Sequence, residues 1–502
     1  MSSLSRNIVT SGINFAVGLG SAFVLLPLMI RGLGAERYGL WMLVSEVTGY
    51  YGYLDLGIRA AVTYYTALYL AKGDHEELNS TASTAFWSLS ALAGLLALSG
   101  WGLARIFPAI FHLSKLDAHE VEQTVMLMAL HIGLAISVDV LASILNGYRR
   151  LDAANMADIA LRVFMAIGTF VCLLQGRGLV ALSWVSVAAR LMALAWVYIA
   201  VRRIAPEVSL SIREVRLSSL RRLARYGVPS LLANLGLQLS ARTDLATIGI
   251  LLDVRMVALY SIPRNLIDYS YQAIRAVAAA FAAHMTHLAA EHREQELFAL
   301  YRRGSRLCGL AVFLLTASIL AFGHDFLLLW QGALFVTGAV TERADIALVI
   351  LAIGFLPRLA SNINVQLLYA TNRLPFLAWT NGIGAVVKIV LSVLLMRPWG
   401  LAGLALANLI PIFLFDGLAV WVYLGCQFQI WNRAFLGETL VRPLLAGAIC
   451  YLAAAGLRVA FPPLHWAGFL AEAAIAGVAG LAAAMAIGLT REERAAVLRW
   501  NS

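Results

Sequence analysis

A stripe of polar residues interrupts an otherwise apolar stretch between residues 256 and 286. The stripe consists of Arg264, Asp268, Tyr271 and Arg275. Their spacings of four, three and four residues place them on one face of a helix. Two guanidinium groups against one carboxylate leave positive charge after internal pairing, and arginine binds phosphate oxygens through paired hydrogen bonds. This face therefore suits a phosphorylated or otherwise anionic substrate. The alternative interpretation is a structural ladder of ion pairs that ties the helix to a neighbour.

Other cations inside apolar stretches are candidates for the same kind of site. The substrate-binding candidates outside the stripe are Arg59, Arg242, Arg358 and Lys388. An ionised side chain in the middle of a bilayer costs at least ~2.5–3.5 kcal/mol, so these groups are expected to face water or one another. The second half of the chain holds five such cations against three acids, whereas the first half holds three against four. We therefore expect the second half to form the more cationic wall.

Three acids in similar positions are candidates for binding a coupling ion, either H⁺ or Na⁺: Glu46, Asp55 and Asp268. A carboxylate in a low-dielectric environment takes up a proton more readily than one in water. Asp55 lies four residues before Arg59, so the alternative is that it only neutralises this arginine. Asp139 and Asp158 lie near predicted helix ends, where a hydrogen-bonded helix cap is the common explanation.

The elements that must position these residues are membrane-spanning helices. The chain has 502 residues, of which 61% are apolar and 13% charged, against about 25% charged in soluble domains. Its apolar runs reach the roughly 20 residues that a helix needs to cross a bilayer. The composition therefore excludes a soluble protein and predicts an all-α polytopic membrane protein with fourteen helices. The expected spans are 7–30, 40–70, 82–107, 121–146, 153–175, 178–201, 227–251, 256–286, 307–330, 344–370, 374–396, 400–426, 441–461 and 465–489.

Signals of catalysis or of a cofactor are absent from the sequence. There is no phosphate-binding loop of the ATPase type, and no segment outside the predicted helices is long enough for a catalytic domain. The four cysteines have no paired spacing, and the nine histidines show no metal-ligand spacing beyond His284 and His287, which are expected at a cytoplasmic helix end. We predict a protein that is not an enzyme, with no catalytic residues, metal or cofactor beyond a coupling ion.

The net charge of +10 is explained by topology and does not call for a nucleic-acid partner. When the predicted loops are divided into two alternating sets, one set carries 21 Lys and Arg and the other carries nine. Cytoplasmic loops retain the positive charge, and an even number of helices brings both termini to the same side. Both termini are therefore expected in the cytoplasm.

The densest basic segment lies midway along the chain, and the sequence repeats on either side of it. Residues 33–41 match 252–260 at an offset of 219, and 145–151 match 368–374 at an offset of 223. Such a duplication predicts two parallel six-helix halves with a substrate site between them. The expected organisation is an N-terminal lobe (1–202), a cytoplasmic basic linker (203–226), a C-terminal lobe (227–427) and two additional helices with a cytoplasmic tail (428–502).

Four short motifs carry a family resemblance: Ser5–Asn14, Arg31–Trp41, Tyr53–Gly57 and Ile144–Tyr148. The chain resembles the polysaccharide flippases that export O-antigen and exopolysaccharide repeat units, within the multidrug/oligosaccharidyl-lipid/polysaccharide transporter superfamily. The resemblance implies two six-helix lobes that open alternately to each side of the bacterial inner membrane. The implied substrate is an undecaprenyl-diphosphate-linked oligosaccharide, whose diphosphate meets Arg242, Arg264 and Arg275. Transport in that family is commonly driven by an ion gradient.

Two other classes of function remain to be compared with a flippase. The first is a multidrug-type, cation-coupled antiporter of small molecules, for which an excess of acidic groups in the cavity would be expected. The second is a membrane glycan polymerase or ligase, which would need a large extracytoplasmic loop, and the segment at 107–120 is too short for one. The expected partners are therefore the lipid-linked glycan, membrane lipids and other proteins of polysaccharide assembly.

Overall fold

The computed structural model describes residues 3–50, 57–111, 113, 116–360, 362–428, 433–461, 465–490 and 493–494, apart from some side chains within helices. The described residues form helices and short connections, without a strand. Ten of the helices are long and apolar enough to cross a membrane. The all-α membrane fold expected from the composition is therefore confirmed, while the number of fourteen crossings stays a prediction.

Two of the long helices contain a sharp glycine kink. Helix α1 (Ser3–Gly49) bends at Gly34, which has φ 80° and ψ 163°, and α12 (Leu374–Pro411) bends at Gly400, which has φ 53° and ψ −131°. A positive φ is strained for residues with a Cβ atom, so glycine is suited to both positions. The kinks lie at the junctions predicted between the spans 7–30 and 40–70 and between 374–396 and 400–426.

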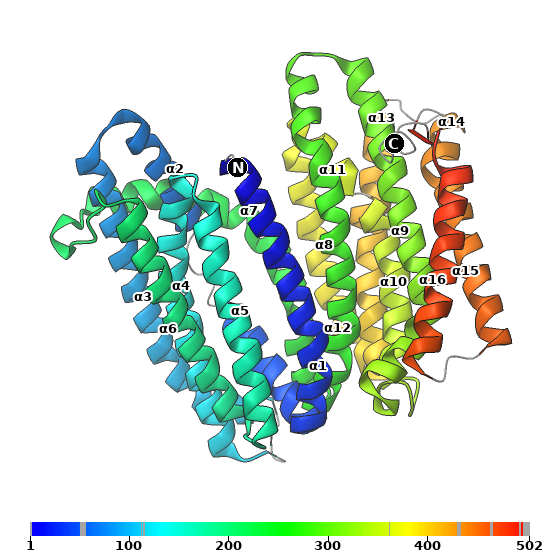
Figure 1. Cartoon of the computed structure of the whole chain (residues 1–502), viewed down its shortest axis with the longest axis horizontal. Helices are drawn as coiled ribbons and strands as arrows, with labels where there is room; N and C mark the ends of the chain where they lie inside the picture. The colour runs from blue at the N-terminus through cyan, green and yellow to red at the C-terminus, as the bar shows by residue number, and fades with distance from the viewer. Residues whose placement is uncertain are drawn as a thin grey trace. The chain divides into compact units, whose positions relative to one another are not determined.

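The chain forms two compact units, Met1–Ala258 (unit 1) and Leu259–Ser502 (unit 2). In unit 1, α4 lies at the centre and packs against α3 and α6, as Figure 1 shows, and also against α2, α1 and α5. The buried core of this unit includes Ala61, Leu141 and Val197. The remaining helices of unit 1 are α2 (Ile58–Lys72), α3 (His75–Ile110), α4 (Ala118–Gly147), α5 (Leu151–Leu174), α6 (Leu179–Ile204) and α7 (Leu217–Leu251).

Unit 2 is organised around α9, which packs against α10, α11, α15 and α16. Separate small cores lie along this helix, and one of them contains Cys308, Leu367 and Phe435. The helices are α8 (Val254–Ala290), which begins in unit 1, α9 (Glu294–Gln331), α10 (Ala344–Ala360), α11 (Asn362–Ala370), α13 (Val420–Phe428), α14 (Arg433–Leu436), α15 (Arg442–Ala460) and α16 (Trp466–Ala483), with π-helical segments at Ile412–Ala419, Gly437–Val441 and Ala484–Gly488.

The basic linker folds back onto unit 1. Residues 205–216 contain a single 3-10 turn, Ile212–Glu214, and lie against the start of α3. The hydroxyl of Ser83 donates a hydrogen bond to the Ser209 carbonyl at 2.8 Å, and Tyr148 donates to Glu207 at 2.7 Å. Val208 is fully buried, at 1% exposure. The linker is therefore part of the packing of unit 1, and α7 belongs to the same unit.

The turns of the two halves share an unusual backbone geometry at the offsets of the sequence repeat. Arg149 and Asn372, 223 residues apart, have φ 59° and 57°, and Gly73 and His292, 219 residues apart, have φ 68° and 57°. Each of these residues follows a helix end, and the next amide hydrogen-bonds to a carbonyl five residues earlier, as in a Schellman cap. The recurrence of these caps supports an internal duplication.

Close packing of α3 against α4 leads to a first prediction. A Cβ atom at Gly100 would lie 2.3 Å from the Cβ of Ala129, whereas a Cβ at Gly94, on the same helix, would meet nothing within 4 Å. Gly100→Ala is expected to destabilise the protein by about 1–3 kcal/mol through overpacking, and Gly94→Ala to leave it unchanged or slightly more stable. Thermal unfolding of the purified variants in detergent measures both. Equal melting temperatures would contradict this packing.

Candidate functional site

Charged side chains from separate helices of unit 1 lie close to one another. Arg59, in the first turn of α2, forms an ion pair of 2.5 Å with Asp139 of α4. The side chains are 49% and 37% exposed, although their helices are otherwise apolar. Because charged groups avoid lipid, this exposed pair is expected to face an aqueous space. Asp139 therefore pairs with an arginine 80 residues away, and the expectation that it acts as a helix cap is wrong.

The second part of this site lies on α1 and α5. Asp158 and Arg162 are four residues apart on α5, and Arg162 contacts Asn14 of α1. Arg162 Nε donates a hydrogen bond of 3.1 Å to Asn14 Oδ1, and Asp158 lies within electrostatic range of Arg162 and Asp139. Gly18 provides the room for this arginine, since a Cβ there would lie 2.9 Å from Arg162 Nη1. Asp158 is thus part of an interhelical network, and its assignment as a helix cap is also wrong.

Arg190 of α6 is the third cation of the site. Its Nη2 lies 3.4 Å from Nε2 of His131, whose Nδ1 lies 2.9 Å from the carbonyl oxygen of Ser186. The carbonyl can only accept, so Nδ1 carries the proton and Nε2 accepts from the guanidinium. Arg190 also lies within electrostatic range of Asp139 and Asp158. It therefore joins the two parts of the site.

We call Arg59, Asp139, Asp158, Arg162 and Arg190 the unit 1 charge cluster. Three arginines against two aspartates leave one net positive charge, so the cluster can attract an anionic group while its acids orient the guanidiniums. Sequence reasoning selected only Arg59 as a site residue. The spacing of Asp158 and Arg162 was visible in the sequence, but nothing in it indicated that Arg59 meets Asp139.

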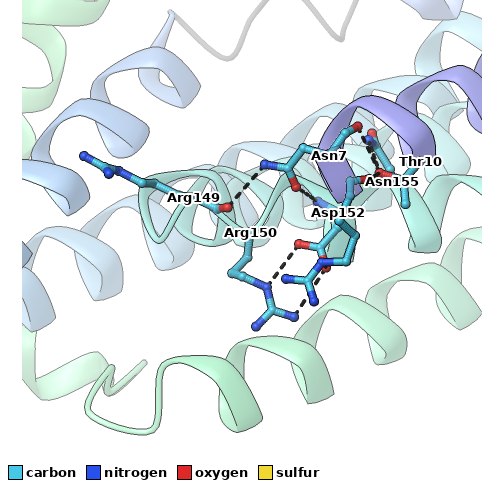
Figure 2. A network of polar contacts seen from close by, with 7 residues as sticks. Asn7, Thr10, Arg149, Arg150, Asp152 and Asn155 are labelled. Carbon is cyan, nitrogen blue, oxygen red and sulfur yellow. Dashed lines mark hydrogen bonds and ion pairs between the residues drawn. The ribbon is translucent and has the colours of Figure 1, made fainter. Parts of the chain in front are cut away.

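A polar network at one end of unit 1 holds α1 against α5 and so positions Asn14 (Figure 2). The Asn7 amide group donates to the Arg149 carbonyl at 3.4 Å, and Asn7 Oδ1 accepts from the backbone N–H of Asp152 at 3.0 Å. The Asp152 carboxylate pairs with Arg6 at 2.9 Å and with Arg150 at 3.1 Å. One turn further along, the side-chain amide of Asn155 donates to Thr10 and Ser11.

Two other sequence candidates lie in unit 1, in different surroundings. Glu46, near the end of α1, is only 6% exposed. Arg242 of α7 approaches Gly49 so closely that a Cβ there would lie 2.6 Å from Arg242 Nη1. Asp55 lies outside the described residues. Arg242 is therefore placed against the kinked helix α1, and Gly49 provides the space that its guanidinium occupies.

The stripe on α8 has the local geometry that its spacing predicts. Arg264 Nε lies 3.8 Å from Asp268 Oδ2, and the guanidinium of Arg275 lies 5.6 Å from the centre of the Tyr271 ring. Arg275 is exposed. Lys388 of α12 is 5% exposed. The side chain of Arg358 lies outside the described ones.

Two named relatives match most of the length of this chain. It is 20% identical over 500 residues to a protein of Bacillus subtilis named "Uncharacterized membrane protein EpsK", covering 97% of both. It is 22% identical over 406 residues to the "Probable low-salt glycan biosynthesis flippase Agl15" of Haloferax volcanii, covering 81% of this chain and 80% of the relative.

Solved structures show the same fold. The "Lipid II flippase MurJ, inward closed conformation" superposes with a TM-score of 0.75, at 12% identity, covering 95% of this chain and 97% of that one. An inward-facing multidrug resistance MATE family transporter of the MOP superfamily gives a TM-score of 0.69, at 13% identity, covering 82% and 96%. The fold is thus that of MOP superfamily transporters. These structures and the Haloferax protein are named as transporters or flippases and not as enzymes, as the sequence predicts.

The family itself follows from a match to a family model over more than half of the chain. Residues 6–283 match the model described as "Polysaccharide biosynthesis protein". The matched region includes the whole unit 1 charge cluster and the stripe on α8. The polysaccharide branch indicated by the short sequence motifs is confirmed, and the chain belongs to the polysaccharide biosynthesis protein family.

Proposed function

We propose that this protein is a flippase that moves a lipid-linked oligosaccharide repeat unit, carried on undecaprenyl diphosphate, across the bacterial inner membrane. The observation that supports it most directly is the unit 1 charge cluster, in which three arginines face two aspartates inside apolar helices. A diphosphate is a suitable ligand for guanidinium groups held in fixed positions. Membership of a polysaccharide biosynthesis family supports the glycan part of the proposal.

The proposed mechanism is alternating access. The cluster binds the diphosphate on the cytoplasmic side, with both termini in the cytoplasm, and the two units then re-open to the other side. An ion gradient of H⁺ or Na⁺ drives the cycle, with Glu46, Asp55 and Asp268 as candidate ion-binding residues. The arginines of the α8 stripe, Arg242, Arg358 and Lys388 are candidates for further contacts with the substrate. Other polysaccharide assembly proteins receive the flipped unit.

Deletion of the gene in its native host tests this function. The expected result is loss of surface polysaccharide together with accumulation of the lipid-linked repeat unit in the cytoplasmic leaflet, and both should be reversed by the wild-type gene. Leaflet position can be read from protection of the glycan against a soluble glycosidase in sealed vesicles. Unchanged surface polysaccharide would contradict the proposal. Drug resistance conferred by expression would instead favour the multidrug-type antiporter.

A further inference from the structure

A second basic site lies in unit 2, and none of the residues proposed above for transport lines it. A cavity of about 690 Å³ opens between one face of α9, the π-helical turn before α15 and the residues that follow α16. We call it the tail pocket, and its wall includes Phe298, Arg302, Arg303, Arg306, Glu438 and Glu493. Its volume falls within the range of small-ligand sites in proteins, about 300–1,000 Å³.

A frame of ion pairs forms the inner wall of the tail pocket. Arg306 is buried, with a side chain 5% exposed, and pairs with Glu438 at 2.9 Å and with Glu493 at 2.5 Å. Glu493 also pairs with Arg303 at 3.5 Å. Its backbone N–H and carboxylate make reciprocal hydrogen bonds with Thr490, as in a capping box. The inner wall is therefore held by contacts that join the tail to α9.

The charge state of this frame follows from its contacts. Burial works to raise the pKa of Glu493, but hydrogen bonds from Arg306 and from the Thr490 backbone, with the Arg306 charge, hold it below its ordinary value. Glu493 is thus ionised at neutral pH. The three arginines then exceed the two glutamates by one positive charge. Arg306 Nε is buried and has no hydrogen-bond partner among the described residues.

Arg302 carries the positive charge that remains after Arg303 and Arg306 have paired with Glu438 and Glu493. It is half-buried on the pocket wall and makes no ion pair with any part of the chain that the structure describes. Phe298 lies one turn before it on the same face of α9, so the wall combines a guanidinium with an apolar ring. The apolar span of α9 begins just after Arg306 in the sequence. This places Arg302 at the level of lipid headgroups, where basic pockets between membrane helices bind anionic lipids.

We propose that the tail pocket binds a phosphate group, with Arg302 as its principal ligand. The phosphate belongs either to an anionic phospholipid, whose glycerol and upper acyl carbons contact Phe298, or to a soluble phosphate compound. Binding there stabilises the association of Thr490 and Glu493 with α9. This site is independent of the proposed transport site in unit 1, so failure of one proposal leaves the other standing.

The experiment uses the full-length protein purified in detergent, with its melting temperature followed during titration. The probes are dioctanoyl phosphatidylglycerol, inorganic phosphate, and dioctanoylglycerol, which has the acyl chains without phosphate. The variant is Arg302→Glu. The matched control is Arg373→Glu, which makes the same charge change at an exposed arginine between α11 and α12. Arg302→Gln is a second, milder variant that keeps the test valid if the charge reversal prevents folding.

We expect phosphatidylglycerol to stabilise the wild type and Arg373→Glu alike, and its apparent affinity for Arg302→Glu to fall about tenfold or more, as expected for loss of a charged hydrogen bond. Stabilisation by phosphatidylglycerol alone assigns the phosphate to a lipid, and equal stabilisation by inorganic phosphate assigns it to a soluble compound. The proposal is overturned if dioctanoylglycerol stabilises as well as phosphatidylglycerol, or if neither Arg302 variant weakens binding.

Discussion

Arg59→Asp is expected to reduce glycan export about tenfold or more, and addition of Asp139→Arg should recover much of it. Arg59 and Asp139 form a 2.5 Å ion pair, with Asp158 and Arg190 in electrostatic range of Asp139. The single change brings three carboxylates together, which repel each other and an anionic substrate. The pair is about half exposed and contributes at most ~1 kcal/mol, so the rest of the effect comes from the repulsion that the new carboxylate adds; ~1.4 kcal/mol in all corresponds to a factor of ten in rate.

The measurement is surface polysaccharide in the deletion strain, divided by the amount of protein in the membrane fraction. Arg203→Asp is the matched control, since it makes the same change at an exposed arginine near the end of α6. The double variant with the exchanged charges separates two explanations. Recovery of export shows that the ion pair itself matters, and no recovery shows that an arginine is needed at position 59. Normal export by Arg59→Asp would remove the unit 1 charge cluster from the transport mechanism.

Arg264→Ala combined with Arg275→Ala is expected to abolish glycan export while leaving the protein inserted in the membrane. These residues carry the two positive charges of the α8 stripe, where Arg264 lies 3.8 Å from Asp268 and Arg275 lies against Tyr271. Their removal leaves the stripe with the carboxylate of Asp268, which repels a diphosphate, and the phenol of Tyr271, which has no charge to bind one. The loss of two charged contacts corresponds to at least about 100-fold in rate if each contributes ~1.4 kcal/mol.

Export and membrane insertion are measured as for Arg59, and Arg255→Ala at the start of the same helix is the control. Single replacements distinguish substrate binding from a structural ladder of ion pairs. A ladder predicts reduced melting temperature and reduced insertion for each single variant. Substrate binding predicts normal insertion with lower export. Full export by the double variant would show that the stripe does not contact the substrate.

Local patterns in the sequence predicted the features that depend on neighbouring residues. The boundaries between the apolar runs were predicted near Gly34 and Gly400, where α1 and α12 continue through a kink at a glycine with positive φ. The spacing of four residues between Arg264 and Asp268 sets their side chains on one helical face. Hydropathy predicted the all-helical membrane fold, since a helix satisfies its own backbone hydrogen bonds in lipid.

The sequence by itself therefore determined the class of fold and the family, because each depends on composition, helical period or short motifs. Only the tertiary structure decided which charges meet. Arg59 finds Asp139 across 80 residues, Arg162 finds Asn14 across 148, and Arg306 finds Glu493 across 187. Such pairs depend on how helices pack and rotate against one another, and one polar residue on an apolar helix looks the same in the sequence whichever partner it meets.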